Sequence, residues 1–351
     1  MVMFGLRDAA VQLRQLLRDQ GPTPGAARQM AKMLLRTVSG AKTGSRIDGM
    51  RRQPKYDFSM GVPFGFVSGA TPPPVFRIAA ACHMFHPDLS GEFREALARI
   101  PGHVNVVIST DTEDKRAEIV RAFSFWDKGE VDVRIVANRG RDIGPKLTEF
   151  GDVYDRHDLV LHLHSKRSIT RRPDGSVRID GSKWRRYLLH TLAGSPAIIG
   201  SVLEAFRRDP RLGIVMPQHW EPIRHWVNCA DTFFVARDLG RRMGIRLTRA
   251  HVIDFPSGSM FWARPAALRP ILELGLRLED FPDEAGQQEG TPAHAVERLF
   301  LFACEAAGYR WTKICDPTES RHPQSVIPID TTAAFDAYRL RYGYRLTAAG
   351  P

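Results

Sequence analysis

Apolar and polar positions form alternating blocks along the chain, and each block has the period of one kind of element. Short, mostly apolar runs predict strands at residues 75–85, 103–109, 131–137, 159–164 and 212–217. Apolar residues at intervals of three and four predict helices at 91–100, 113–125, 146–154, 195–208 and 291–308. Strands that alternate with helices favour a parallel sheet built from βαβ units. The expected fold class is α/β, Rossmann-like, with a mostly parallel sheet flanked by helices.

The N-terminal part has a different pattern and a different charge. Two short amphipathic helices are predicted there, followed by a stretch rich in glycine, proline and charge. Residues 1–56 hold eleven lysines and arginines against three aspartates. Such a basic face suits a helix lying on anionic lipid headgroups, or a solvated surface packed on the main domain. The expected organisation is a basic helical extension and linker at 1–70, a main domain at 71–316 and a tail with a short helix at 317–351.

Composition and charge restrict the class of protein and its location. The 351 residues are 43% hydrophobic and 25% charged, which is typical of a soluble globular protein, and no apolar run is long enough to span a bilayer. Arg7 and Asp8 interrupt any signal peptide, and the four cysteines lack metal-ligand spacing. We expect a cytoplasmic protein, peripheral on the inner face of the plasma membrane, with an anionic membrane surface as partner. Aromatic and basic residues of the tail predict a helix at that interface, or one docked on the main domain.

Polar residues follow three of the predicted strands, at the positions where ligands bind in open parallel sheets. Ser109 and Asp111 follow the second strand, residues 138–145 follow the third, and His164 and Lys166 end the fourth. The carboxyl ends of these strands are therefore the candidate binding edge.

The segment 138–145 reads Asn-Arg-Gly-Arg-Asp-Ile-Gly-Pro. Its two glycines would let the backbone approach a ligand, and Arg139 and Arg141 would bind a phosphate in bidentate fashion. Asp142 would accept hydrogen bonds from ribose or sugar hydroxyls, and the following helix would offer its N-terminus to an anion. The alternative is a glycine-rich turn with surface arginines and an N-capping aspartate.

The fourth strand ends in His162, His164 and Lys166, spaced by two and so on one face. Two histidines at this spacing suit zinc, but no neighbouring acid or cysteine completes a shell. A cationic cradle for a diphosphate, with Lys166 as the fixed charge, and purely structural histidines are the other readings.

Residues 255–298 combine aromatic residues with many ionisable groups. Gly258 and Ser259 precede an apolar run, Glu284 and Glu289 lie in a loop, and a helix follows. That helix opens with His294, Glu297 and Arg298. An apolar platform edged by carboxylates suits a sugar.

Together these segments resemble the rhamnan synthesis F family. The resemblance rests on 138–145, 161–168, Trp184-Arg185, 258–264 and 290–298, and covers about residues 76–316 in consistent order. It implies a GT-A-like glycosyltransferase of cell-surface polysaccharides. The implied donor is a nucleotide-activated L-rhamnose, with dTDP-rhamnose expected, and the implied acceptor is a growing, often lipid-linked glycan.

The resemblance also implies roles for residues. Ser109 and Asp111 would contact the nucleoside. Where such folds carry a metal-binding Asp-x-Asp, this chain has His162-Leu163-His164-Ser165-Lys166, so we expect no divalent metal and no other cofactor. The expected donor-binding set is Ser109, Asp111, Asn138, Arg139, Gly140, Arg141, Asp142, Gly144, His164, Lys166 and Ser168.

Inverting transfer needs a base for the acceptor hydroxyl. Glu289 is the favoured candidate; Glu284, His294 and Glu297 are the others, with Glu297 also open to a structural ion pair. The expected sugar- and acceptor-binding set is Trp184, Arg185, Gly258, Ser259, Met260, Phe261 and Trp262, although Phe261 suits a core position as well.

Two other functions fit parts of the sequence. The net charge of +11 would suit a nucleic-acid binder, but no nucleic-acid motif is visible and we expect no such partner. A non-catalytic carbohydrate-binding or scaffold protein of a polysaccharide assembly complex is the remaining alternative.

Overall fold

The structure is a computed structural model that describes residues 56–67, 76–167, 169–171, 177–284, 290–342 and 346. The predicted N-terminal helices, Ser168 and Glu289 lie outside the described residues. Residues 50–351 form one compact unit.

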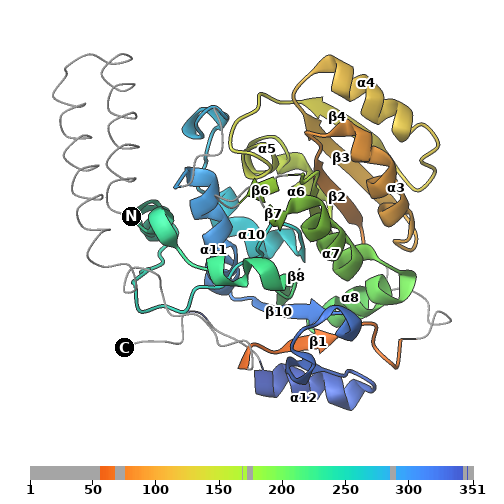
Figure 1. The fold of residues 1–351 in the computed structure, drawn as a ribbon, viewed down its shortest axis with the longest axis vertical. Coiled ribbons are helices and arrows are strands. Elements are labelled where there is room, and N and C mark those ends of the chain that lie inside the picture. The colour runs from red at the N-terminus through yellow and green to blue at the C-terminus, as the bar shows by residue number, and fades with distance from the viewer. Residues whose placement is uncertain are drawn as a thin grey trace. The chain divides into compact units, whose positions relative to one another are not determined.

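The described part of the chain builds one nine-stranded sheet in the order β11-β1-β10-β8-β9-β5-β2-β3-β4 (Figure 1). Its strands are β1 (Ser59–Gly61), β2 (Ile78–His83), β3 (Val104–Thr110), β4 (Val131–Ile135), β5 (Leu159–His164), β8 (Leu212–Pro217), β9 (Phe261–Ala263), β10 (Arg310–Cys315) and β11 (Val326–Ile327). Only β9, of these nine, runs antiparallel to its neighbours β5 and β8. A small hairpin of β6 (Ile169–Arg171) and β7 (Val177–Asp180) stands apart from this sheet.

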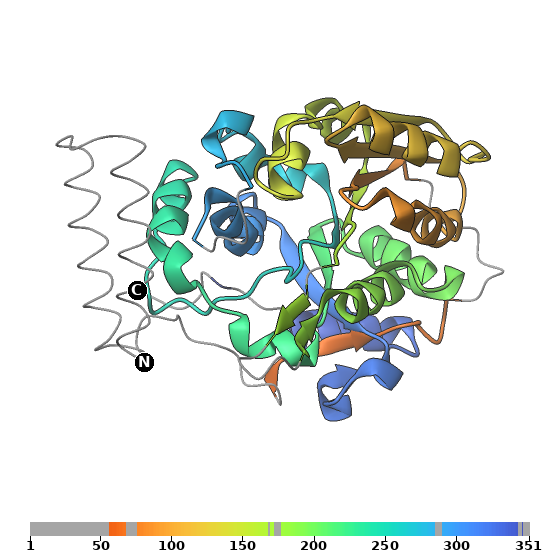
Figure 2. The ribbon, with the colours of Figure 1, turned by 45° about the horizontal axis from the view of Figure 1, so that its top comes forward.

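Helices cover both faces of the sheet (Figure 2). The described helices are α3 (Ser90–Ala98), α4 (Glu113–Ala122), α5 (Ile143–Thr148), α6 (Gly151–Arg156), α7 (Gly181–Ala193), α8 (Pro196–Arg208), α9 (Phe233–Arg242), α10 (Pro265–Leu272), α11 (Pro292–Ala306) and α12 (Thr332–Tyr342). Ala80 and Cys82 of β2 pack in the core shared with α3, α4, α7 and α8, whereas Ala79 and Ala81 pack in the core shared with α6, α10 and α11. This alternation is what a strand buried on both faces requires.

The α/β fold class, with a mostly parallel sheet flanked by helices, is confirmed, as are the five predicted strands to within a few residues. The single helix predicted at 146–154 is wrong. Two short helices, α5 and α6, replace it because the chain leaves helical geometry at Phe150, whose ring is fully buried. Gly151 then begins the second helix.

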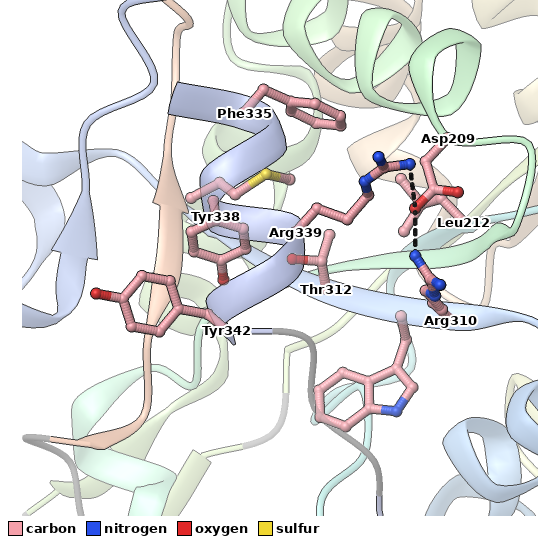
Figure 3. Close-up of a pocket in the computed structure, with 10 residues that line it drawn as sticks. Asp209, Leu212, Arg310, Thr312, Phe335, Tyr338, Arg339 and Tyr342 are labelled. Carbon is pink, nitrogen blue, oxygen red and sulfur yellow. Dashed lines mark ion pairs between the residues drawn. The ribbon is translucent and has the colours of Figure 1, made fainter. Parts of the chain in front are cut away.

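The C-terminal helix α12 is docked on the main domain. Phe335 and Tyr338 are 2% and 3% exposed and belong to the same core as β2 and α8. Beside them, the Asp209 carboxylate lies 3.6 Å from Arg310 and 4.0 Å from Arg339, at a cavity of about 30 Å³ (Figure 3). The docked alternative for the tail is therefore correct, and these two aromatic side chains do not face a membrane.

Two short strands extend the sheet beyond the predicted main domain. β1 pairs with β10 and β11, so residues 59–61 and 326–327 supply one edge of the sheet. The boundaries expected at 70 and 316 remain predictions. In the described ranges no helix by itself is long and apolar enough to cross a membrane; α7 and α8, bent by 61° at their junction, pass that test only as a pair.

Candidate functional site

The polar strand ends meet where the direction of the sheet connections reverses. β2 pairs with β3 on one side and β5 on the other, and His83 and His164 are partners in register at their carboxyl ends. Open α/β sheets bind ligands at such a switch point. The candidate site is therefore built around these two histidines.

An ion pair lies between the two strand ends. Lys146 Nζ is 3.2 Å from Asp142 Oδ2, and the other carboxylate oxygen of Asp142 lies 3.9 Å from His164 Nδ1. Both partners of the ion pair are almost completely buried, at 2% and 6% exposure. The structure does not favour the predicted role of Asp142 as a direct acceptor for ligand hydroxyls, because the carboxylate is buried and one of its oxygens is paired with Lys146.

Burial and charge act in opposite directions on these groups. Burial alone would raise the pKa of Asp142, but His164, Lys146, His83 and Lys166 together hold it well below its usual range. Burial lowers the pKa of His164 to about 3, so the imidazole is neutral at pH 7 and the charges acting on Asp142 are then those of the lysines. Burial also lowers the pKa of Lys146, against the pull of Asp142.

His83 and Ser109 form a second buried pair at the ends of β2 and β3. The Ser109 hydroxyl lies 2.9 Å from His83 Nδ1, and Ser109 is fully buried. Burial lowers the pKa of His83 to about 4. Ser109 therefore orients His83 rather than contacting a nucleoside. The sequence analysis missed His83, although a lone histidine closing the run Ile-Ala-Ala-Ala-Cys-His was a usable signal.

Asp111 is also engaged within the protein. Its carboxylate lies 2.5 Å from Lys115 Nζ, one helical turn ahead, while Thr112 caps α4 by accepting from the Lys115 amide. The acidic residues after β3 thus stabilise the start of a helix.

The turn at 138–145 needs its glycines for its own packing. Gly140 has φ of 68°, and a β-carbon there would lie 2.7 Å from the Phe281 ring. A β-carbon on Gly144 would lie 2.4 Å from the Arg139 carbonyl oxygen. The two glycines therefore agree with the alternative of a glycine-rich turn, because the packing of the turn itself requires them. Asn138 is half-buried. The next residue, Arg139, forms an isolated antiparallel β-bridge with Asp283.

The two arginines of this turn face an acidic segment. Arg139 forms an ion pair of 2.7 Å with Asp283, and Arg141 lies 3.7 Å from Glu284. Both arginine side chains keep about a third of their surface exposed, at 30% and 37%. They remain able to reach an anion if these surface pairs open, since such pairs are weak. The predicted anion site at a helix N-terminus is not supported, because the short α5 has the Asp142 carboxylate at its start.

Lys166 is half-buried and follows the end of β5 by two residues. Its ammonium lies 4.3 Å from the centre of the Trp184 ring, which stacks in turn on Trp220 at 6.4 Å. Burial lowers the pKa of Lys166, Glu297 and Asp142 raise it, and Arg141 lowers it further. Lys166 therefore lies within electrostatic reach of both carboxylates and of the turn arginine.

A turn at Gly258 and Ser259, with positive φ at both residues, precedes β9 and packs against Trp184. Gly258 and Ser259 have φ of 86° and 54°. His164 Nε2 donates to the Gly258 carbonyl at 2.7 Å. Glu297 Oε1 accepts from the Gly258 amide at 3.1 Å and from the Ser259 hydroxyl at 3.2 Å. Hydrogen bonds with His164, at the end of β5, and with Glu297, on α11, thus hold the turn in place.

Glu297 is a structural residue in this arrangement. Its second oxygen lies 2.5 Å from Arg298, which stacks over Phe255 at 4.5 Å. The structural ion pair weighed for Glu297 is present, and the carboxylate accepts from three donors, one from each of three residues.

His294 is a weak candidate for the base. Its Nδ1 lies 2.8 Å from the Thr291 hydroxyl, and burial followed by the charges of Arg141 and Arg298 lowers its pKa to about 3. A base of that pKa rarely removes a proton at neutral pH. Glu289 lies outside the described residues, which leaves Glu284 as the described alternative.

Three residues predicted to bind sugar are core residues. Met260, Phe261 and Trp262 are fully buried in β9 and just before it, and Trp262 donates to the Leu192 carbonyl at 3.1 Å. A sugar cannot stack on rings covered on both faces, so this expectation is wrong. Arg185 is likewise engaged, with Glu92 at 3.0 Å and with the Lys166 carbonyl at 2.5 Å.

His162 does not join His164 in a common ligand set. Its ring is stacked between Phe261 at 4.4 Å and Tyr154 at 5.8 Å. Among the described residues, no group of three or more histidines, cysteines or carboxylates is arranged to hold a metal ion. Near the strand ends, Asp111 and Asp142 are each paired with a lysine, so this donor set fits a divalent cation poorly.

A buried charge network, not predicted from the sequence, contacts the residues that lead into the Gly258–Ser259 turn. Lys313 of β10 lies 2.7 Å from Asp57 and 2.6 Å from Asp254. Asp254 accepts from His219 Nε2 at 2.9 Å, and His219 Nδ1 lies 2.9 Å from the hydroxyl of Ser257, the residue before Gly258. Lys313, in the run Arg-Trp-Thr-Lys-Ile-Cys, is a charge inside an otherwise apolar strand, and that pattern was the available signal.

A second cavity lies at the other edge of the sheet. It has a volume of about 490 Å³ and is lined by Asp158, before β5, and by Arg264, after the antiparallel β9. The cavity beside Asp209 also lies at amino ends, those of β8 and β10. Neither belongs to the cluster at the carboxyl ends.

Comparisons with known proteins identify relatives of the chain. The family model described as Rhamnan synthesis protein F matches residues 67–309. The uncharacterized protein WxcX of Xanthomonas campestris pv. campestris, in strain B100 and in a second strain, is 34% identical over 236 residues. That match covers 66% of this chain and 32% of WxcX, so the chain spans about a third of the length of the curated relatives it matches.

A comparison with solved structures finds the mannosyltransferase PcManGT from Pyrobaculum calidifontis, in complex with GDP-Man and Mn²⁺. The TM-score is 0.36 at 13% sequence identity, and the match covers 78% of this chain and 64% of that one. A likeness at this level carries no argument about fold or ligand.

Proposed function

Because the chain belongs to the rhamnan synthesis F family, we propose that its described domain is a glycosyltransferase of cell-surface polysaccharide synthesis, with a GT-A-like fold. It moves a sugar from a nucleotide-sugar donor to a growing glycan. The observation that carries the proposal is the group of Lys146, Asp142, His164 and Lys166 at the switch point of the sheet.

The chemistry of transfer requires positive charge at the leaving diphosphate. Lys146 is compensated by Asp142 at 3.2 Å, so its role is to hold that carboxylate and the end of β5 in place. Lys166 and Arg141 supply the charge at the mouth of the site. Both act as cations. Arg141, whose side chain is about a third exposed, can also donate two hydrogen bonds to one phosphate group.

This charge supports transfer without a divalent metal. The position that would hold a metal-binding carboxylate carries His164 and Lys166, and a lysine cannot ligate a cation while it is protonated. Lys166 thereby takes the place that a metal ion would have in stabilising the leaving group.

A carboxylate from the residues that precede α11 acts as the base for the acceptor hydroxyl in an inverting transfer. Glu289 is the proposed base, with Glu284 as the second candidate. Glu297 orients the Gly258–Ser259 turn and does not exchange protons, because its oxygens accept from that turn and from Arg298.

The proposed donor is dTDP-L-rhamnose and the proposed acceptor is a lipid-linked or polysaccharide glycan. A lipid-linked acceptor places the enzyme at the inner face of the plasma membrane, where its basic N-terminal part meets anionic lipid. The test is flotation with anionic and neutral liposomes. Equal recovery with both, or none with either, would reject the location.

Calorimetric titration with dTDP, UDP and GDP, each with Mg²⁺ and with EDTA, tests the site. The expected result is micromolar binding of one nucleotide, unchanged by EDTA and lost in Lys166→Ala. Lys183→Ala is the matched control, because Lys183 is an exposed lysine on the neighbouring α7. Binding that requires Mg²⁺ would overturn the metal-independent mechanism, and binding of none of the three would favour a non-catalytic carbohydrate-binding protein.

A further inference from the structure

The helix α9 and the loop after it carry a concentrated positive charge. Between Thr232 and Ile253 the chain has five arginines and one acidic residue, Asp238. The arginines are Arg237, Arg241, Arg242, Arg246 and Arg249. We call these five residues together with Phe234 the α9 patch.

An exposed aromatic ring lies in the middle of the patch. Phe234 is 41% exposed, which is unusual for a phenylalanine of this protein, whose other α9 phenylalanine is 6% exposed. The guanidinium groups of Arg237 and Arg249 lie 5.2 Å and 5.5 Å from its ring centre. The arginines therefore surround the ring and do not cover it completely.

Much of the positive charge faces solvent. The side chain of Arg241 is 69% exposed and that of Arg237 is 40% exposed, and Arg242 and Arg246 are exposed as well. The one acidic residue, Asp238, lies 3.4 Å from both Arg237 and Arg241, which compensates at most one of the five charges. Exposed like charges at this density repel one another. An approaching anionic surface therefore lowers the electrostatic free energy of the patch.

The apolar side of α9 is fixed to the rest of the domain. Ala236 and Leu239 are buried in the core that also contains Val296 and Leu299 of α11. Arg298 of α11 donates to the carbonyl of Asn228 at 3.2 Å, five residues before α9 begins. The patch is thus rigidly connected to the helix that carries His294 and Glu297.

We propose that the α9 patch is a docking surface for an anionic lipid bilayer. Arginines would bind the phosphates of the headgroups, and the Phe234 ring would enter the interfacial layer, where aromatic side chains are favoured. An exposed ring between arginines fits this layer better than it fits a purely ionic polymer. Docking through α9 would hold α11, and with it the candidate site, next to lipid-linked molecules.

The surface is testable independently of any catalytic activity. The four cysteines are all buried, so a cysteine introduced at Phe234 can be labelled selectively with an environment-sensitive fluorophore. In the full chain carrying Phe234→Cys, vesicles of phosphatidylcholine with phosphatidylglycerol should shift the emission to the blue. Phe125→Cys is the control, because Phe125 is 87% exposed and lies outside the α9 patch, three residues after α4. It should show no shift.

A charge variant measures the electrostatic part. Arg237→Gln, Arg241→Gln and Arg246→Gln together should weaken partitioning to the anionic vesicles roughly 100-fold, at about fivefold for each basic residue near the surface. The matched control, Arg121→Gln with Arg156→Gln and Arg269→Gln, removes the same charge from exposed positions elsewhere and should keep wild-type partitioning. Equal weakening in both variants, no shift at position 234, or the same shift with duplex DNA would overturn the proposal. These outcomes leave the calorimetric test of nucleotide binding unaffected.

Discussion

The side chains at the carboxyl ends of β2 and β5 illustrate how burial sets chemical roles. Asp142, Lys146 and His164 are nearly inaccessible, and they stabilise each other as an ion pair beside a neutral imidazole. Removing one member of a buried ion pair costs several kcal/mol, because the other charge is left uncompensated. Their role is therefore to fix the strand ends, while Lys166 and Arg141 are the residues proposed to meet a ligand.

The buried histidines make stability depend on pH. The pKa of His83 is about 4 in the folded protein and about 6.5 in the unfolded chain. Its contribution to stability is complete above pH 6.5 and is lost as pH falls towards 4, since only the unfolded chain then takes up the proton. That contribution is on the order of 3 kcal/mol. Unfolding by urea at pH 7 and pH 4.5 should show a smaller pH dependence in His83→Gln than in the wild type, whereas an identical dependence would contradict this assignment.

A pair of variants separates a structural Glu297 from a catalytic one. Glu297→Ala removes the acceptor of the Gly258 amide and the Ser259 hydroxyl and should lower the free energy of unfolding by about 2 kcal/mol. Glu297→Gln keeps an acceptor oxygen and should lose less than half of that, with transfer activity reduced but present. Complete loss of transfer in Glu297→Gln at wild-type stability would instead identify Glu297 as the base.

At the scale of elements, the sequence was informative where a pattern is local. Strand Leu159–His164 and helix Pro196–Arg208 were predicted with correct ends, because a short apolar run and a Ser-Pro start are local signals. The strands β1 and β11 were not predicted. They have three and two residues, and their pairing with β10 and with each other depends on distant parts of the chain.

The same distinction applies to the site. The polar strand ends were predicted correctly as a meeting place, since topology alone brings them together. The burial of Phe261 and the ion pair of Glu297 were open alternatives from the sequence, and the burial of Trp262 was not predicted, because the outcome depends on β9 inserting antiparallel between β5 and β8. Sequence spacing gives no information about that insertion.

The buried network joins three elements and makes a strong prediction. Lys313 of β10 lies between Asp57, before β1, and Asp254, in the loop that leads to Gly258. Lys313→Met leaves the buried Asp254 without its lysine and Asp57 with Arg224, at 2.8 Å, as its remaining cation, and should lower the free energy of unfolding by about 3–5 kcal/mol. Thermal or urea unfolding measures this, with the exposed Lys183→Met as a control that should change it by less than about 0.5 kcal/mol. A Lys313→Met protein as stable as the control would show that the network does not hold the loop.

At the scale of the whole molecule, the cationic cluster lies at the edge of the sheet where the topological switch point is found. The switch point between β2 and β5 holds the cationic cluster, and α11 connects it to the arginines of α9. A nucleotide-sugar donor and an anionic membrane would both be attracted by this distribution of charge. In the function proposed above, this distribution of charge would bring an anionic donor and a membrane-bound acceptor to neighbouring surfaces.

The most direct measurement is ³¹P NMR of dTDP-L-rhamnose incubated with the full chain and acceptor-bearing membranes in the presence of EDTA. We expect release of dTDP by the wild type, its loss in Lys166→Ala and its retention in Lys183→Ala. Parallel incubations with UDP- and GDP-sugars test the choice of donor. No release from any of these donors would contradict the proposed transferase, and release only when a divalent metal is restored would contradict the role given to Lys166.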